Sequence, residues 1–324
     1  MKNIQKKAFT TLSPFTTKKR ISAFYSCCFS IIAMCLEINA SAVRLEVLKG
    51  TGTMSSVLSG RVQKVGGGTM SLASPNPSLV SLDIHGGTVS VAGTANLGAS
   101  TAVSLSGSGC ALQGAGSLAV RSLALSAAGA VTNSGATTIA SATLAGNVLT
   151  TNSVGGTTIT SLVPDATGSI ANADALTLVG ATAVAQPINV SGAGATSIAG
   201  PLNSTGGFVS SASAVSLGAA GQLPTGTNAF SGGSLSLAAS GAAAAIRSAT
   251  NFTGSAQFNI PASATPGSIT GAVNFASGTA AVLGGTSDAG ILGTGGSYTF
   301  QPGSTISVPD GATWSAPVTI LTAS

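Results

Sequence analysis

The sequence predicts an all-β fold, namely a right-handed parallel β-helix, or β-solenoid, with roughly 20–25 residues per coil. Three observations predict this fold. Short segments alternate apolar and polar residues between glycines, phenylalanine recurs at a nearly fixed spacing, and the chain combines 44% hydrophobic residues with 6% charged residues. Each coil of a solenoid contacts only its neighbours, so equivalent positions stack into ladders along the axis.

Alternation with a period of two residues, bounded by glycine or asparagine, is typical of β-strands. No segment after residue 42 shows helical periodicity over three turns. We therefore expect strands at 89–91, 103–105, 118–120, 123–125, 159–160, 176–178 and 188–190.

Phenylalanine gives the strongest repeat. No aromatic residue occurs between Val43 and Gly207, and several follow. The first three phenylalanines of this region are evenly spaced, and the next two follow at slightly longer intervals. Several open a phrase in which apolar residues recur after a glycine turn. We predict that five side chains stack as one structural ladder: Phe208, Phe230, Phe252, Phe275 and Phe300.

The chain accordingly divides into three parts. Residues 1–42 are a predicted secretory signal peptide, residues 43–207 an aliphatic solenoid rich in Gly, Ala, Ser and Thr, and residues 208–324 coils with the Phe ladder. In the aliphatic part, Ile139, Ile159 and Leu178 recur at nearly equal intervals. Disorder and another all-β fold are the alternatives, but disorder usually accompanies low hydrophobicity and high charge.

Charge is confined largely to the beginning of the chain. Residues 1–42 hold six basic side chains and one acidic side chain, which account for the whole net charge of +5. The remaining residues carry six bases and six acids. The basic balance therefore belongs to the leader and predicts no nucleic-acid partner.

The leader has the three parts of a secretory signal: a basic stretch through Arg20, an uncharged apolar run at 21–36, and a small-residue cleavage site at Ala40 and Ala42. We expect the mature chain to begin at Val43 and contact a membrane only during export. A retained anchor is disfavoured because a span needs about 20 apolar residues. A lipoprotein reading at Cys35 is disfavoured by the bulky Met34 before it.

Three of the four cysteines lie in the leader, so a mature chain keeps Cys110 alone and forms no internal disulfide. We interpret Cys110 as a small apolar filler, because the sequence places no base beside it that would lower its pKa. His85 is interpreted as an exposed turn residue, since one histidine near one aspartate supplies too few ligands for a metal.

Glycosidase and lyase chemistry needs paired acids, and the acids here are scattered. Asp165 and Asp174 are well separated along the chain. Asp288 and Asp310 are separated by the same interval as the first phenylalanines, so adjacent coils could bring the two carboxylates to a cation. Both aspartates stand in ordinary turn sequences, however, and a turn role is the expected one. We therefore predict no catalytic residue, no cofactor and no metal. Thr-x-Thr, which could order water on a sheet, appears once clearly, at 158–160, and does not repeat in register, so ice binding has little support.

With a leader, a charge-poor mature chain and repeats such as Phe230-Ser-Gly-Gly-Ser-Leu235-Ser-Leu237, the sequence resembles the passenger region of bacterial autotransporter and filamentous-haemagglutinin-type β-helical adhesins. The resemblance covers residues 208–324 best and the rest by composition. It implies a β-helical rod exported across the outer membrane and displayed at, or shed from, the cell surface. The family's membrane domain has no counterpart in this sequence, which favours a truncated member, export with a separate partner, or a free-standing solenoid.

We expect a non-enzymatic, extracellular or cell-surface solenoid with a structural or adhesive role. Its expected partners are a host or cell-surface glycan or protein, and further copies joined through the solenoid ends. The alternatives are a self-assembling extracellular matrix or fibre subunit and a carbohydrate-active enzyme on a β-helix.

Overall fold

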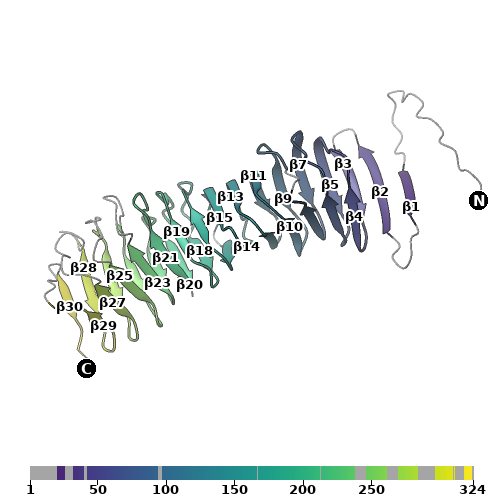
Figure 1. Cartoon of the computed structure of the whole chain (residues 1–324). Helices are drawn as coiled ribbons and strands as arrows, with labels where there is room; N and C mark the ends of the chain where they lie inside the picture. The colour runs from purple at the N-terminus through teal and green to yellow at the C-terminus, as the bar shows by residue number, and fades with distance from the viewer. Residues whose placement is uncertain are drawn as a thin grey trace, which may run out of the picture.

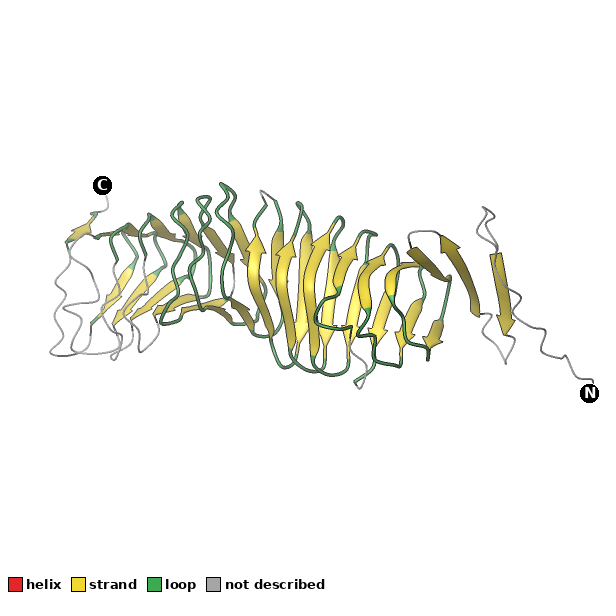
Figure 2. Ribbon diagram, turned by 90° about the horizontal axis from the view of Figure 1, so that it is seen from above, coloured by secondary structure: helices red, strands yellow, loops and turns green. Residues whose placement is uncertain are grey.

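The computed structural model describes residues 20–25, 32–39, 42–93, 97–165, 167–211, 213–237, 246–260, 269–283, 296–308, 310 and 317–322, with only the backbone described at 20–25 and 32–39. Over these residues the chain is all-β, with no helix, and its strands stack side by side along a rod (Figures 1 and 2). The predicted class, a parallel β-solenoid, is confirmed. Ala40 and Asp288 lie outside the described residues.

The strands form two long sheets, because consecutive strands alternate between them. The first sheet has 16 strands and contains β1 and β2 followed by every odd-numbered strand: β1 Arg20–Tyr25, β2 Ile32–Asn39, β3 Ala42–Val47, β5 Gly60–Val65, β7 Leu79–Ile84, β9 Ala102–Leu105, β11 Leu118–Leu125, β13 Thr137–Thr143, β15 Thr157–Val163, β17 Leu176–Leu178, β19 Thr196–Ile198, β21 Ala214–Leu217, β23 Ser234–Leu237, β25 Gln257–Ile260, β27 Ala280–Leu283 and β29 Thr305–Ser307.

The second sheet has 14 strands and takes the even-numbered strands from β4 onward. Every pairing in this sheet is parallel, as is every pairing from β3 onward in the first. Its strands are β4 Thr51–Met54, β6 Thr69–Leu72, β8 Thr88–Val91, β10 Cys110–Gly114, β12 Gly129–Asn133, β14 Val148–Ser153, β16 Ser169–Asn172, β18 Ile188–Ser191, β20 Phe208–Ser211, β22 Asn228–Phe230, β24 Thr250–Phe252, β26 Ala272–Phe275, β28 Ser297–Phe300 and β30 Val318–Ile320.

The strands β1 and β2 differ from the rest because they pair antiparallel, with each other and with β3. Residues of the predicted leader thus extend the first sheet at its N-terminal edge, where Asn39 pairs with Ala42. Cleavage after Ala42 stays a prediction.

Coil length can be read from the register and changes along the rod. Near the N-terminal end Thr51 pairs with Thr69, which makes a short coil. Near the C-terminal end Phe275 pairs with Phe300, so the chain there travels further before it returns to the same position. The coil between Phe275 and Phe300 is longer than those before it, although one coil of the aliphatic part, from Thr88 to Ala111, is as long as the coil from Phe252 to Phe275.

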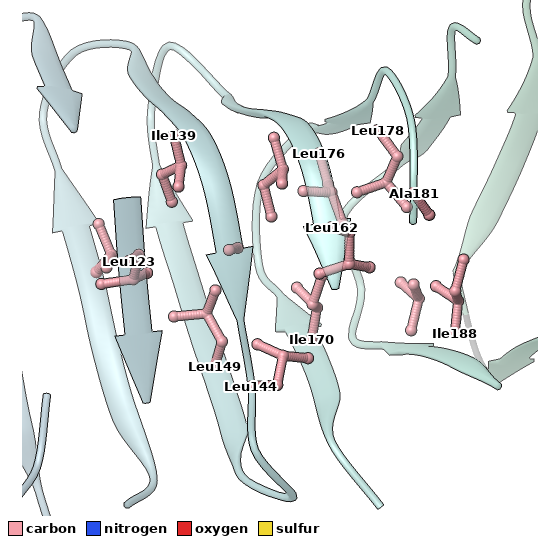
Figure 3. Packing of buried hydrophobic residues seen from close by; sticks show 14 of the residues in the cluster. Leu123, Ile139, Leu144, Leu149, Leu162, Ile170, Leu176, Leu178, Ala181 and Ile188 are labelled. Carbon is pink, nitrogen blue, oxygen red and sulfur yellow. The ribbon is translucent and has the colours of Figure 1, made fainter. Parts of the chain in front are cut away.

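The interior of the aliphatic part is built from alternate residues of facing strands (Figure 3). Ile139, Ile159 and Leu178 pair in register, as their spacing predicted, and each is fully buried. The two segments expected at 118–120 and 123–125 are instead one strand, β11, in which Arg121 has no partner in the register with β13. Its side chain is exposed between two buried stretches.

Downstream, aromatic rings replace part of this aliphatic filling. Phe230, Phe252, Phe275 and Phe300 pair in strict register. The ring centroids of successive members lie 5.2, 5.1 and 4.5 Å apart, with ring planes within 16° of parallel. Phe208 stands two residues out of this register, because Ser210 is the residue that pairs with Phe230. Its ring reaches Phe230 in a tilted contact at 5.9 Å.

One corner of the solenoid interior is polar rather than apolar. Thr137, Ser153 and Thr157 are buried and share hydrogen bonds, with Oγ–Oγ distances of 2.9 Å and 3.1 Å. Asn133 donates its amide to Thr137 Oγ1 at 3.1 Å. These side chains hydrogen-bond to one another, so their polar groups have partners although they are buried.

Candidate functional site

The most regular surface feature lies on the outward side of the second sheet, from β4 to β14. Two columns of side chains run along it, each made of residues that pair in register on successive strands. We call these two columns together the Thr/Ser face. One column is Thr51, Thr69, Thr88, Ala111, Ala130 and Thr150, and the other is Thr53, Ser71, Ser90, Gln113, Thr132 and Asn152.

The Thr/Ser face is uncharged, and its side chains are half-buried or exposed. Strand neighbours lie about 4.8 Å apart, and residues i and i+2 of one strand about 6.6 Å apart. Except at Ala111 and Ala130, the face therefore presents hydroxyl and amide groups at regular spacings in two directions. Beneath it, the alternate residues of the same strands are buried; Val89 and Leu112, for example, are both 0% exposed.

The face is hollowed where alanine replaces threonine. A surface depression of about 330 Å³ is lined by small and apolar residues together with one hydroxyl of the face: Gly109, Cys110, Ala128, Gly129, Ala130, Val148 and Thr150. Its volume lies at the low end of the range for small-ligand sites. The lining is apolar apart from Thr150, whose hydroxyl belongs to the Thr/Ser face.

A third polar column runs along the outer side of the first sheet, and we call it the odd-strand column. Its members pair in register from β13 to β25: Thr138, Thr158, Thr177, Ser197, Ser216, Ser236 and Asn259. Asn259 donates to Ser236 Oγ at 3.3 Å. On β13 and β15 a second in-register pair, Ser141 and Ser161, lies three residues further along the strands.

Thr-x-Thr itself does not repeat in register, as expected, because Thr51-Gly52-Thr53 pairs with Thr69-Met70-Ser71. Thr51-Gly52-Thr53 begins an array that continues as Thr69-x-Ser and Thr88-x-Ser on the next two strands. The array is not apparent as Thr-x-Thr because serine takes the place of the second threonine after Thr69 and Thr88, and the coil beyond Thr88 is longer. Thr69 pairs with Thr88, whereas Thr88 pairs with Ala111 after a visibly longer coil.

Chemically distinctive side chains meet at a second place, the corner where β5 and β7 end and β8 begins. Lys64 lies at 0% exposure, and its Nζ donates to the carbonyl oxygens of Gly66 and Gly86 at 2.5 Å and to that of Gly68. Burial lowers the pKa of Lys64 below its ordinary value, while the charge interaction with Cys110 acts in the opposite direction. The sequence analysis did not single out Lys64.

Above this corner His85 lies exposed, as predicted from its turn sequence. Its Nε2 lies 2.7 Å from Gln63 Nε2, and its Nδ1 lies 2.9 Å from Ser106 Oγ. Three successive coils of the first sheet are thereby linked by side chains on the outside. The surrounding surface is open, and the three groups act as a cross-coil hydrogen-bond bridge.

Cys110 is buried at 1% exposure, and its Sγ donates to the carbonyl oxygen of Ile84 at 3.1 Å. Burial raises the pKa of the Cys110 thiol; the hydrogen bond with Gly107 and the Lys64 charge act against this shift. A basic side chain is therefore nearby, contrary to the sequence reading, but desolvation dominates. The thiol is held in its neutral form, in keeping with a packing role.

The acids stay apart in the described part of the chain. Asp165 accepts a hydrogen bond from the backbone N–H of Thr167 at 3.4 Å, as in a turn. Asp165 precedes β16 and Asp174 follows the other end of that strand, and Asp310 is exposed near the C-terminal end. Across the residues that the structure describes, no three His, Cys, Asp or Glu side chains gather as metal ligands would. The pair of Asp288 and Asp310 falls partly outside them.

Comparison of the chain with protein-family models, with curated proteins and with solved structures finds no match. Nor do the described segments include a helix with the length and hydrophobicity of a membrane span. The class of protein that the fold defines is a parallel two-sheet β-solenoid with polar columns on its outer faces.

Proposed function

We propose that the chain is a non-enzymatic β-solenoid, exported through the leader at 1–42, that acts outside the cell as a structural or adhesive rod. We propose further that it binds carbohydrate through the Thr/Ser face. The single observation that carries this proposal is the pair of in-register columns with the depression beside them.

Carbohydrate fits this surface for a physical reason. Sugar hydroxyls both donate and accept hydrogen bonds, as threonine and serine hydroxyls do, and a neutral glycan needs no charged partner. A polysaccharide is itself periodic, so it can meet equivalent groups on several coils at once. Many weak contacts of this kind add up through multivalency.

A second candidate is the ordering of water at an ice surface. It is favoured by the three consecutive strands β4, β6 and β8, which carry Thr-x-Thr, Thr-x-Ser and Thr-x-Ser in register. Ice binding and glycan binding would use the same face, and freezing-point depression separates them.

The test begins with protein recovered from the medium of cells that process the leader. N-terminal sequencing should give Val43 as the first residue. Recovery only from inside the cell, with residues 1–42 attached, would contradict export. The secreted protein is then applied to a glycan array and to intact cells.

The decisive comparison uses two matched double variants. Thr88→Lys with Thr132→Lys places two charges on the Thr/Ser face, and Thr158→Lys with Ser216→Lys places two charges on the odd-strand column. We expect the first variant to weaken glycan binding at least about tenfold, or about 1.4 kcal/mol, and the second to bind as the parent does. Equal binding by both variants, or no binding by the parent, would refute the proposed face. Release of reducing ends would instead indicate an enzyme.

A further inference from the structure

Lys64 interrupts an apolar column in the core. It is aligned across neighbouring strands with Leu45 on β3 and Ile84 on β7, and Ile84 is followed by Leu105 on β9. These three neighbours are at most 1% exposed, and Lys64 is itself at 0% exposure. Lys64 is the one charged side chain that is buried in the core among the residues that the structure describes. Burying a charge is costly unless its hydrogen-bonding groups are satisfied.

The ammonium is satisfied entirely by backbone carbonyls. Its three N–H groups meet three acceptors: the oxygens of Gly66 and Gly68 from its own coil and that of Gly86 from the next coil. An ammonium has three donors and no acceptor, so this set is complete. The carbonyls of Gly66 and Gly86 lie outside the strand ladders, since β5 ends at Val65, β7 ends at Ile84 and β8 begins at Thr88.

Glycine is what allows these carbonyls to converge. Gly66 has a positive φ of 82°, and a Cβ there would lie 2.4 Å from the oxygen of Val47. A Cβ on Gly68 would lie 2.8 Å from the oxygen of Gly50, and one on Gly87 would lie 2.3 Å from the oxygen of Gly68. The runs Gly66–Gly68 and Gly86–Gly87 therefore build a cage whose walls are backbone.

We infer that the carbonyls of Gly66, Gly68 and Gly86 form a cation-binding site, occupied in the native chain by the tethered ammonium of Lys64. When the side chain is shortened, the site accepts a free primary alkylammonium ion. The ammonium thereby ties two successive coils together near the N-terminal end of the solenoid.

Two variants of Lys64 test this inference, with Lys49→Ala as the control because Lys49 is an exposed lysine on the coil just before. Lys64→Met keeps an unbranched side chain that packs in the core but removes the ammonium, so the carbonyls of Gly66 and Gly86 lose its hydrogen bonds while that of Gly68 keeps the N–H of Thr88. We expect it to lower the urea midpoint of unfolding, whereas a side chain needed only for packing would leave the midpoint unchanged.

Lys64→Ala removes the alkyl chain of the lysine and so leaves space in the core for a small ligand. We expect n-propylammonium chloride to raise its unfolding midpoint in a saturable way, because a ligand bound only by the folded state stabilises it. Tetramethylammonium chloride at equal ionic strength should not, since it has no N–H donor, and Lys49→Ala should respond to neither salt. Equal responses to the two salts would overturn the inference. If Lys64→Ala does not fold, the Met variant decides: a midpoint equal to the parent's overturns the inference, and a lowered midpoint with faster amide exchange at 66–69 supports it.

Discussion

Single side chains differ in what they contribute to this rod, and the phenylalanines contribute most per residue. Phe252 is 1% exposed and touches three other rings, those of Phe230, Phe258 and Phe275. Burying an aromatic side chain stabilises by its area and by ring contacts. In the aliphatic part the same space is filled by branched aliphatic side chains.

Replacing Phe252 by alanine removes a ring from the middle of the stack. We expect a loss of about 3–5 kcal/mol, since a cavity forms and the neighbouring rings lose contacts. The measurement is the urea concentration at the midpoint of unfolding, with unfolding monitored by circular dichroism. Val209→Ala is the control, because Val209 is 37% exposed. Similar midpoints for the two variants would show that the ladder does not support the fold.

The phenylalanine spacing was visible in the sequence, but the register of its first member was not. Strand β20 pairs with β22 through Ser210 and Phe230, so the coil there is two residues shorter than the interval from Phe208 to Phe230. A fixed period predicts stacking only where coil lengths stay constant. Cys110 and Lys64 show the same limit, because residues distant in sequence become neighbours only when coil lengths are known.

Among the elements, the turns between strands set the length of each coil. Gly233 has a positive φ of 65°, and a Cβ there would lie 2.1 Å from the oxygen of Ser213 on the preceding coil. Gly109 has a similar φ of 71°, and a Cβ there would meet nothing within 4 Å. The first glycine is required by both conformation and space, and the second by conformation alone.

Substitution of these two glycines separates the cost of a left-handed backbone conformation from the cost of a steric clash with the preceding coil. Gly109→Ala should destabilise by about 1 kcal/mol, the cost of a left-handed non-glycine residue. Gly233→Ala should destabilise by clearly more, because the coils must also move apart. Thermal unfolding of both variants is the measurement. Equal effects would mean that adjacent coils are not packed backbone to backbone at this turn.

The strands themselves were predictable from alternation with glycine breaks, as at β8, β9, β17 and β18. Which outward residues align was not, because serine takes the place of threonine on β6 and β8 and the coil after Thr88 is longer than the two before it. The polar columns could be recognised only after the register of β4, β6 and β8 was known. The single strand β11 was also missed, since Arg121 breaks its alternation.

The molecule as a whole is a rod whose properties follow from stacking coils along one axis (Figure 1). In the described strands no charged residue pairs in register with one of like charge, the interior changes from aliphatic to aromatic along the axis, and polar columns repeat from coil to coil over parts of both sheets. The repeated faces are what an adhesive or structural role would use, and they depend on parallel strands in register.

That register is tested directly by cysteine pairs on the odd-strand column. Thr158 pairs with Thr177 on the next strand, and Thr177 pairs with Ser197 on the one after. Neighbouring parallel strands lie about 4.8 Å apart, within reach of a disulfide, whereas two strands span about 9.6 Å, which is beyond it.

Mild oxidation followed by peptide mass spectrometry should link Cys at 158 and 177 within one molecule in the double variant Thr158→Cys/Thr177→Cys. The variant Thr158→Cys/Ser197→Cys should stay reduced. Linkage of both pairs at similar rates, or of neither, would contradict the stacked, in-register solenoid on which every inference above depends.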